Sequence, residues 1–200
     1  MKPKLFALLG GILLTTSSTT AEPNEHKEIQ ELYRRGLAGD KAAVEPCIAK
    51  LEAVLKKEPE NQLARVYLGS AYTLRSRDLG FGPKKLRALK QGLAVMDEAV
   101  NRAPKEPKVR LARALTTSAL PGIFGRGASS RKDFEMLAEL ATSQPGKFEE
   151  GDLQLVHYHA GLAAKAAGDR TRASLLWRKA LAHPADPRLS EKIRAELAGL

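Results

Sequence analysis

The stretch Leu155–Pro184, LVHYHAGLAAKAAGDRTRASLLWRKALAHP, decides the fold class of this 200-residue chain. On both sides of Gly168-Asp169, apolar residues recur three and four positions apart, which places them on one face of a helix. Gly168-Asp169 predicts a tight turn, and Pro184 predicts the end of the segment that follows. We therefore predict a pair of antiparallel helices.

The rest of the chain from Ile29 onward has the same three- and four-residue spacing, and no window alternates with period two. The predicted fold class is therefore all-α. The sequence also matches itself at a period of 43, without gaps. Six residues recur 43 positions later: Val66, Leu68, Ala71, Thr73, Phe81 and Gly82 align in that order with Val109, Leu111, Ala114, Thr116, Phe124 and Gly125. An internal repeat of this kind is typical of stacked helical hairpins.

Turn and capping residues divide the chain into about four hairpins and a closing helix. The predicted helices run from Asn24 to Ala38, from the Gly39-Asp40 turn to Lys57, from Leu63 to Leu74, from Pro83 to Arg102, from Val109 to Ala119, from Ser129 to Ala141, on both sides of Gly168, and from Leu189 to Leu197. Ser130 and Asp152 are predicted caps. Pro46 leaves two alternatives open, because proline fits only a first turn: its helix begins at Glu45 or bends there.

Two motifs resemble the tetratricopeptide repeat: Leu68-Gly69-x-x-Tyr72 and the segment Gly161–Pro184. The resemblance implies that Gly161, Ala173 and Ala180 allow two helices to approach closely while Trp177 fills the space between them. It also implies an α-solenoid whose concave face binds a protein or peptide partner, with no enzymatic reaction. We likewise expect no cofactor and no metal site, because the residues show no pattern that would bind either. The second and third hairpins depart from the family pattern because they are about ten residues longer than the usual repeat.

The N-terminus resembles a signal peptide. Lys2 and Lys4 precede an apolar run from Leu5 to Leu14, and Thr19-Thr20-Ala21 has the form of a signal-peptidase site. We expect cleavage after Ala21 and export to the periplasm or the medium, which leaves one helical domain over residues 22–200. The apolar run is only about 15 Å long as a helix, so no integral membrane span is expected after cleavage.

Composition narrows the classes of partner. Without the leader the chain carries 31 basic and 23 acidic side chains, a formal charge of +8. The ten aromatic residues of the full sequence are not interleaved with a basic cluster, so nucleic-acid binding is not expected. The alternative to an adaptor is a peripheral protein that associates with an anionic membrane surface or an acidic polymer. The lone Cys47 cannot form an intrachain disulfide, and its apolar neighbours predict burial, with pairing between chains as the alternative. The oligomeric state stays open.

Two long loops occupy matching positions in the second and third hairpins, residues 75–83 and 119–127, and each contains a phenylalanine followed by glycine. We expect Phe81 and Phe124 to pack into the groove between adjacent hairpins. The alternative is that these rings, together with Arg77 and Arg126, project toward a partner. No strand precedes the glycines at 122, 125 and 127, so they do not form a phosphate-binding loop.

By register with the repeat, a further set of side chains is expected on the inward face of the first helices. This set contains Val66, Ser70, Thr73, Arg113, Tyr158 and Lys165, a mixed and partly cationic surface that suits an acidic ligand. The alternative is that these are solvated helix faces. His157 and His159 point in directions about 200° apart on a helix, so they are not expected to share a metal ion.

Overall fold

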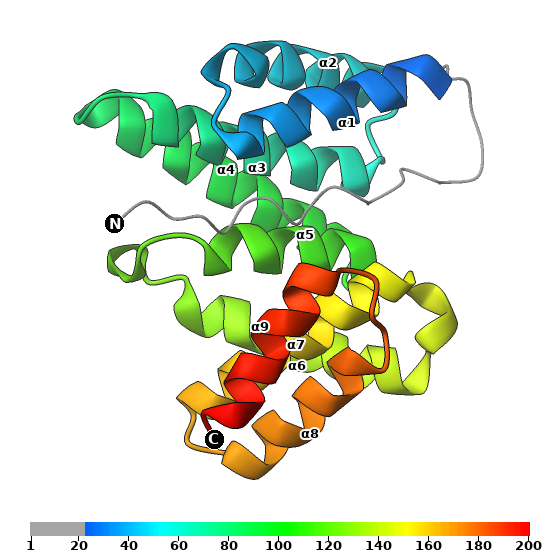
Figure 1. Cartoon of the computed structure of the whole chain (residues 1–200). Coiled ribbons are helices and arrows are strands. Elements are labelled where there is room, and N and C mark those ends of the chain that lie inside the picture. The colour runs from blue at the N-terminus through cyan, green and yellow to red at the C-terminus, as the bar shows by residue number, and fades with distance from the viewer. Residues whose placement is uncertain (1–22) are drawn as a thin grey trace. The chain divides into compact units, whose positions relative to one another are not determined.

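The computed structural model describes residues 23–200, and all of its regular structure is helical (Figure 1). The α-helices are α1 (Pro23–Ala38), α2 (Val44–Lys57), α3 (Gln62–Asp78), α4 (Pro83–Arg102), α5 (Pro107–Ser118), α6 (Gly127–Ser143), α7 (Glu150–Ala166), α8 (Arg170–Leu181) and α9 (Pro187–Ala198). No strand occurs in this part of the chain, so the all-α prediction is confirmed. The predicted leader and its cleavage site lie outside the described residues.

The described helices group into two compact units. The boundary lies within α5, between Arg113 and Ala114. The first unit therefore holds α1 to α4 and the start of α5, and the second holds the remainder of α5 and α6 to α9. None of the helices in residues 23–200 combines the length and apolar character needed to cross a bilayer.

Helix α3 is the centre of the first unit because it packs against α1, α2 and α4. Helices α3 and α4 approach so closely that a Cβ atom on Gly92 would lie 2.5 Å from the carbonyl oxygen of Gly69. The same holds in reverse, since a Cβ on Gly69 would lie 2.7 Å from the Gly92 oxygen. Only glycine permits this backbone approach at both positions. Tyr33 on α1 joins α3 through a 2.7 Å hydrogen bond between its hydroxyl and that of Ser70.

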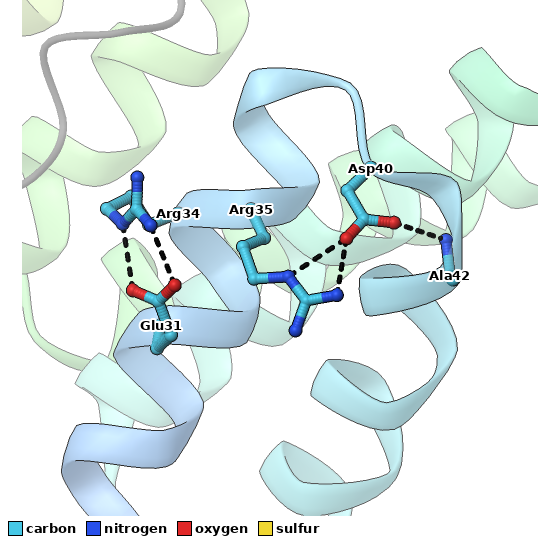
Figure 2. A network of polar contacts seen from close by, with 5 residues as sticks. All are labelled: Glu31, Arg34, Arg35, Asp40 and Ala42. Atoms are coloured by element: carbon cyan, nitrogen blue, oxygen red, sulfur yellow. Dashed lines mark hydrogen bonds and ion pairs between the residues drawn. The ribbon is translucent and has the colours of Figure 1, made fainter.

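Asp40 determines how α1 connects to α2 (Figure 2). Its carboxylate accepts a 3.0 Å hydrogen bond from the backbone N–H of Ala42 and pairs with the guanidinium of Arg35. The bond to Arg35 holds the pKa of the Asp40 carboxyl below its ordinary value. A 3-10 turn, Lys41–Ala43, then leads into α2 at Val44. Pro46 consequently lies in the first turn of α2, where its missing N–H costs no helical hydrogen bond.

The second unit is built around the α7–α8 pair (Figure 1). Trp177 on α8 is fully buried, and its indole N–H donates a 3.0 Å hydrogen bond to the carbonyl oxygen of Tyr158 on α7. Gly161 faces the ring, with a hypothetical Cβ 2.3 Å from Trp177 Nε1. Helix α9 covers part of this pair. The side-chain amide of Gln154 on α7 donates a 2.9 Å hydrogen bond to Ser190 Oγ and accepts a 2.7 Å hydrogen bond from the backbone N–H of Asp186. The predicted core role of Trp177 is confirmed.

Several local predictions need correction. Ser130 lies inside α6 rather than at its cap, and its hydroxyl donates 3.1 Å to the carbonyl oxygen of Ala114. Asp152 lies in the first turn of α7 and is buried, while Glu149 occupies the cap position. Helix α3 continues to Asp78, four residues beyond the predicted end at Leu74. Cys47 is buried, as predicted, and burial raises the pKa of its thiol to about 12.

Candidate functional site

The loop between α3 and α4 is fixed at both ends by hydrogen bonds. Ser76 Oγ donates 3.0 Å to the carbonyl oxygen of Lys85, which ties the last turn of α3 to the first turn of α4. Arg77 Nη1 donates 2.9 Å to the carbonyl oxygen of Gly36 on α1, and its Nε pairs with Asp78 at 2.8 Å. Arg77, a predicted partner-binding residue, therefore anchors this loop.

Phe81 lies at the tip of the same loop, and its side chain is fully exposed, with a relative accessibility of 107%. The expectation that this ring packs into a groove is wrong. Helix α3 continues to Asp78, four residues past its predicted end. This extra helical turn carries the loop beyond the ends of α1 and α2 (Figure 1). Gly82 follows with φ 143°, a left-handed conformation that favours glycine. The structure thus places an isolated aromatic side chain in solvent.

Helix α4 begins beside Phe81 with a strongly basic and partly apolar surface. Leu86 is 47% exposed, and Lys84, Arg87 and Lys90 are also exposed. No acidic residue occurs between Asp78 and Asp97. Leu86 and these cations were not among the predicted partner-binding residues. The sequence feature that could have indicated this surface is a group of four basic residues with no carboxylate among them, which follows a phenylalanine flanked by two glycines.

The matching loop in the second unit has a different conformation. It forms a 3-10 turn, η2 (Gly122–Phe124), that closes with a 2.9 Å hydrogen bond from Gly125 N–H to the Gly122 oxygen. Gly125 is left-handed, with φ 67°. Phe124 is half-buried, whereas its neighbour Ile123, which sequence analysis did not select, is 88% exposed. Each of the two matching loops therefore exposes one large apolar side chain. In the second loop that side chain is Ile123, one residue before Phe124, which is the position that matches Phe81.

Arg126 is half-buried at the N-terminal end of α6. Its backbone oxygen accepts hydrogen bonds from the N–H of Ser130 at 3.0 Å and from the hydroxyl of Ser129 at 2.9 Å. The Arg126 backbone thus fixes the start of α6, shortly after the exposed Ile123. Ile123 is the large side chain that this loop exposes, and Arg126 is only partly accessible.

The predicted inward-facing set is largely unavailable to a partner. Val66, Ser70, Thr73 and Tyr158 are all buried, with relative accessibilities of 0%, 1%, 7% and 8%. The physical reason in the first unit is that α3 is covered by α1, α2 and α4, so it has no open face at these positions. Thr73 Oγ1 also donates 2.7 Å to the Ser70 oxygen within the helix. These four residues contribute to packing.

The two cationic members of that set are paired. Arg113 Nη1 lies 3.1 Å from Asp97 Oδ1, and its side chain is only 14% exposed. Lys165 is exposed, with its Nζ atom 2.8 Å from Glu196 Oε2 on α9 and 5.6 Å from the centre of the Trp177 ring. Lys165 therefore links α7 to α9 within the second unit.

Two histidines on α7 are integrated into the packing of the second unit. His157 is buried, its Nδ1 has no hydrogen-bond partner, and its ring stacks against His183 at 6.2 Å. Burial, assisted by Lys179 and His183, lowers the pKa of His157 to about 4. His159 stacks on Phe134 at 4.6 Å, and burial lowers its pKa to about 4 as well. Both rings are therefore neutral at neutral pH.

Within residues 25–200 no group of three or more histidine, cysteine or acidic side chains is arranged to hold a metal ion. Comparisons with protein-family models, with curated proteins and with solved structures find no match for this chain. The structure therefore offers two separate candidate sites, one loop in each unit, and each loop exposes an apolar side chain at the end of a helix.

Proposed function

We propose that this chain is an exported adaptor of the tetratricopeptide-repeat type, a helical scaffold that binds a protein or peptide partner and catalyses no reaction. The proposal rests on the loop at residues 119–126. It exposes Ile123 to 88% while a closed 3-10 turn and the backbone contacts of Arg126 hold its conformation. An apolar side chain on a fixed loop loses little entropy on binding, so it suits a role as an anchor.

The chemistry of the described side chains supports binding over catalysis. The only cysteine is buried with a raised thiol pKa, which makes it a poor nucleophile. His157 and His159 stay neutral within the packing of α7. The helix pairs are held together by glycine contacts that fix the distances between helices, and a rigid frame of this kind is what an adaptor needs.

A photo-crosslinking experiment tests this proposal. A benzophenone amino acid is placed at position 123 in the full chain expressed in its native cells, and the control carries it at the exposed Ala182, directly after α8. We expect one discrete adduct from position 123 that is absent from position 182. Ile123→Ala should weaken capture of the crosslinked protein about tenfold or more, as expected for an interface anchor. Identical adduct patterns from the two positions would exclude an adaptor site at this loop.

A further inference from the structure

The α3–α4 loop and the start of α4 form a surface that the adaptor proposal does not use. We call residues 79–90 the apolar-basic tip. It contains Phe81 and Leu86, both exposed, and the cations Lys84, Lys85, Arg87 and Lys90. The helical register places Leu86, Arg87 and Lys90 on the outward side of α4, opposite the buried Ala88, Leu89 and Gly92. Apolar and basic side chains therefore share one exposed surface.

The charges of the tip are not neutralised by the described part of the chain. Lys84, Lys85, Arg87 and Lys90 form no ion pair with any residue of the described range. The carboxylates that border the tip in sequence are engaged elsewhere, since Asp78 pairs with Arg77 and Asp97 pairs with Arg113. The tip thus presents a local charge of about +4 together with a bare phenyl ring. An anionic partner is the complement of this surface.

The shape of the tip distinguishes between anionic partners. Phe81 is fully exposed between two glycines, on a loop that extends beyond the neighbouring helices (Figure 1). A protein partner would need a matching pocket for the ring. The interfacial zone of a bilayer takes an aromatic side chain without a matching pocket, and cations that surround the ring then meet the lipid phosphates.

We propose that the apolar-basic tip binds the surface of a bilayer that contains anionic lipids, with Phe81 inserted into the interface and the four cations among the headgroups. This binding is peripheral and reversible. Each cation contributes about fivefold to the vesicle partition coefficient at low salt, and the phenyl ring about tenfold or more. The site lies in the first unit and the adaptor loop in the second, so the failure of either proposal leaves the other intact.

The test uses Phe81→Trp in the full chain as a reporter. Trp177, the only native tryptophan, is fully buried, so the native chain supplies a constant background. Vesicles of phosphatidylglycerol mixed with phosphatidylcholine are compared with vesicles of phosphatidylcholine alone, at low and at physiological salt. We expect co-flotation and a blue shift of the new emission with the anionic vesicles only, weaker at physiological salt. Brominated acyl chains should quench the emission of the introduced tryptophan but not that of the native chain.

Matched variants separate the tip from overall charge. Lys84→Glu/Lys85→Glu should lower the partition coefficient by more than about twentyfold. The control Lys41→Glu/Lys56→Glu changes the net charge equally, at exposed positions of the first unit, and should lower it by less than about threefold. Phe81→Ala should lower partitioning about tenfold, whereas Leu175→Ala, at another exposed apolar position, should leave it unchanged. Circular dichroism confirms that every variant is folded.

Four results would overturn the proposal. One is equal binding to neutral and anionic vesicles, and another is an equal effect of the two lysine pairs. The third is flotation without any shift in the emission of the tryptophan introduced in place of Phe81. The proposal would also be overturned if the chain does not bind anionic vesicles but is retained on immobilised heparin in a salt-sensitive way. The tip would then recognise an acidic polymer.

Discussion

Gly161 on α7 faces the ring of Trp177 on α8, and replacing Gly161 with alanine tests whether this close approach holds the two helices together. A Cβ at position 161 would lie 2.3 Å from Trp177 Nε1 and 2.5 Å from its Cδ1. Trp177 has no free space, because its side chain is fully buried and its N–H is bonded to the Tyr158 oxygen at 3.0 Å. The new methyl group must therefore displace the ring or separate the helices.

The expected cost follows from three contributions. Overpacking of a filled core costs about 1–3 kcal/mol, and disturbance of the buried indole hydrogen bond costs about 1–3 kcal/mol. Alanine regains about 1 kcal/mol of helix propensity. We expect Gly161→Ala to lower the free energy of unfolding by about 1–5 kcal/mol. Trp177→Ala alone should cost about 3–5 kcal/mol. Once the ring is removed, Gly161→Ala should be neutral or stabilising by up to about 1 kcal/mol.

The assay is urea unfolding followed by far-UV circular dichroism for the native chain, both single variants and the double variant. Gly151→Ala on the same helix is the matched control, because its Cβ would meet only Ala185 Cβ at an ordinary 3.8 Å. The control should stay within about 0.5 kcal/mol of the native chain. The reasoning fails if Gly161→Ala is harmless in the native background, or if it destabilises equally when Trp177 is alanine.

Three further predictions concern single residues. The folded chain keeps His157 neutral down to about pH 4, while the unfolded chain takes up the proton near pH 6.5. Stability should therefore fall as the pH drops between these values, and His157 should contribute up to about 1.4 kcal/mol per pH unit to this fall. His157→Gln should reduce that slope in urea titrations at several pH values. Cys47 should resist maleimide labelling in the folded chain and react fully in urea, and rapid labelling without denaturant would contradict its burial. Asn61 caps α3 through a 2.9 Å bond from Ala64 N–H, so Asn61→Ala should cost about 1 kcal/mol in thermal or urea unfolding, whereas Asn101→Ala, at an exposed position in the last turn of α4, should cost nothing.

The exposed loops show where sequence reasoning reached its limit. The period of 43 located both loops and their phenylalanines, because a repeat is a property of the sequence alone. It could not predict that Phe81 would be exposed and Phe124 half-buried. That difference depends on where α3 ends and on the left-handed turn at Gly125, which are determined by packing and local backbone geometry. The same limit applies to Ile123 and Leu86, whose exposure no periodicity indicates.

The sequence by itself determined the helices, most of their boundaries and the core roles of Trp177 and Cys47, because apolar spacing, turn residues and caps act within a few residues of one another. Only the tertiary structure decided which side chains are accessible. Val66, Ser70 and Thr73 were expected to face a ligand, but they are buried because α1, α2 and α4 surround α3. Exposure depends on which helices cover a face, and that is decided by contacts between residues far apart in the sequence.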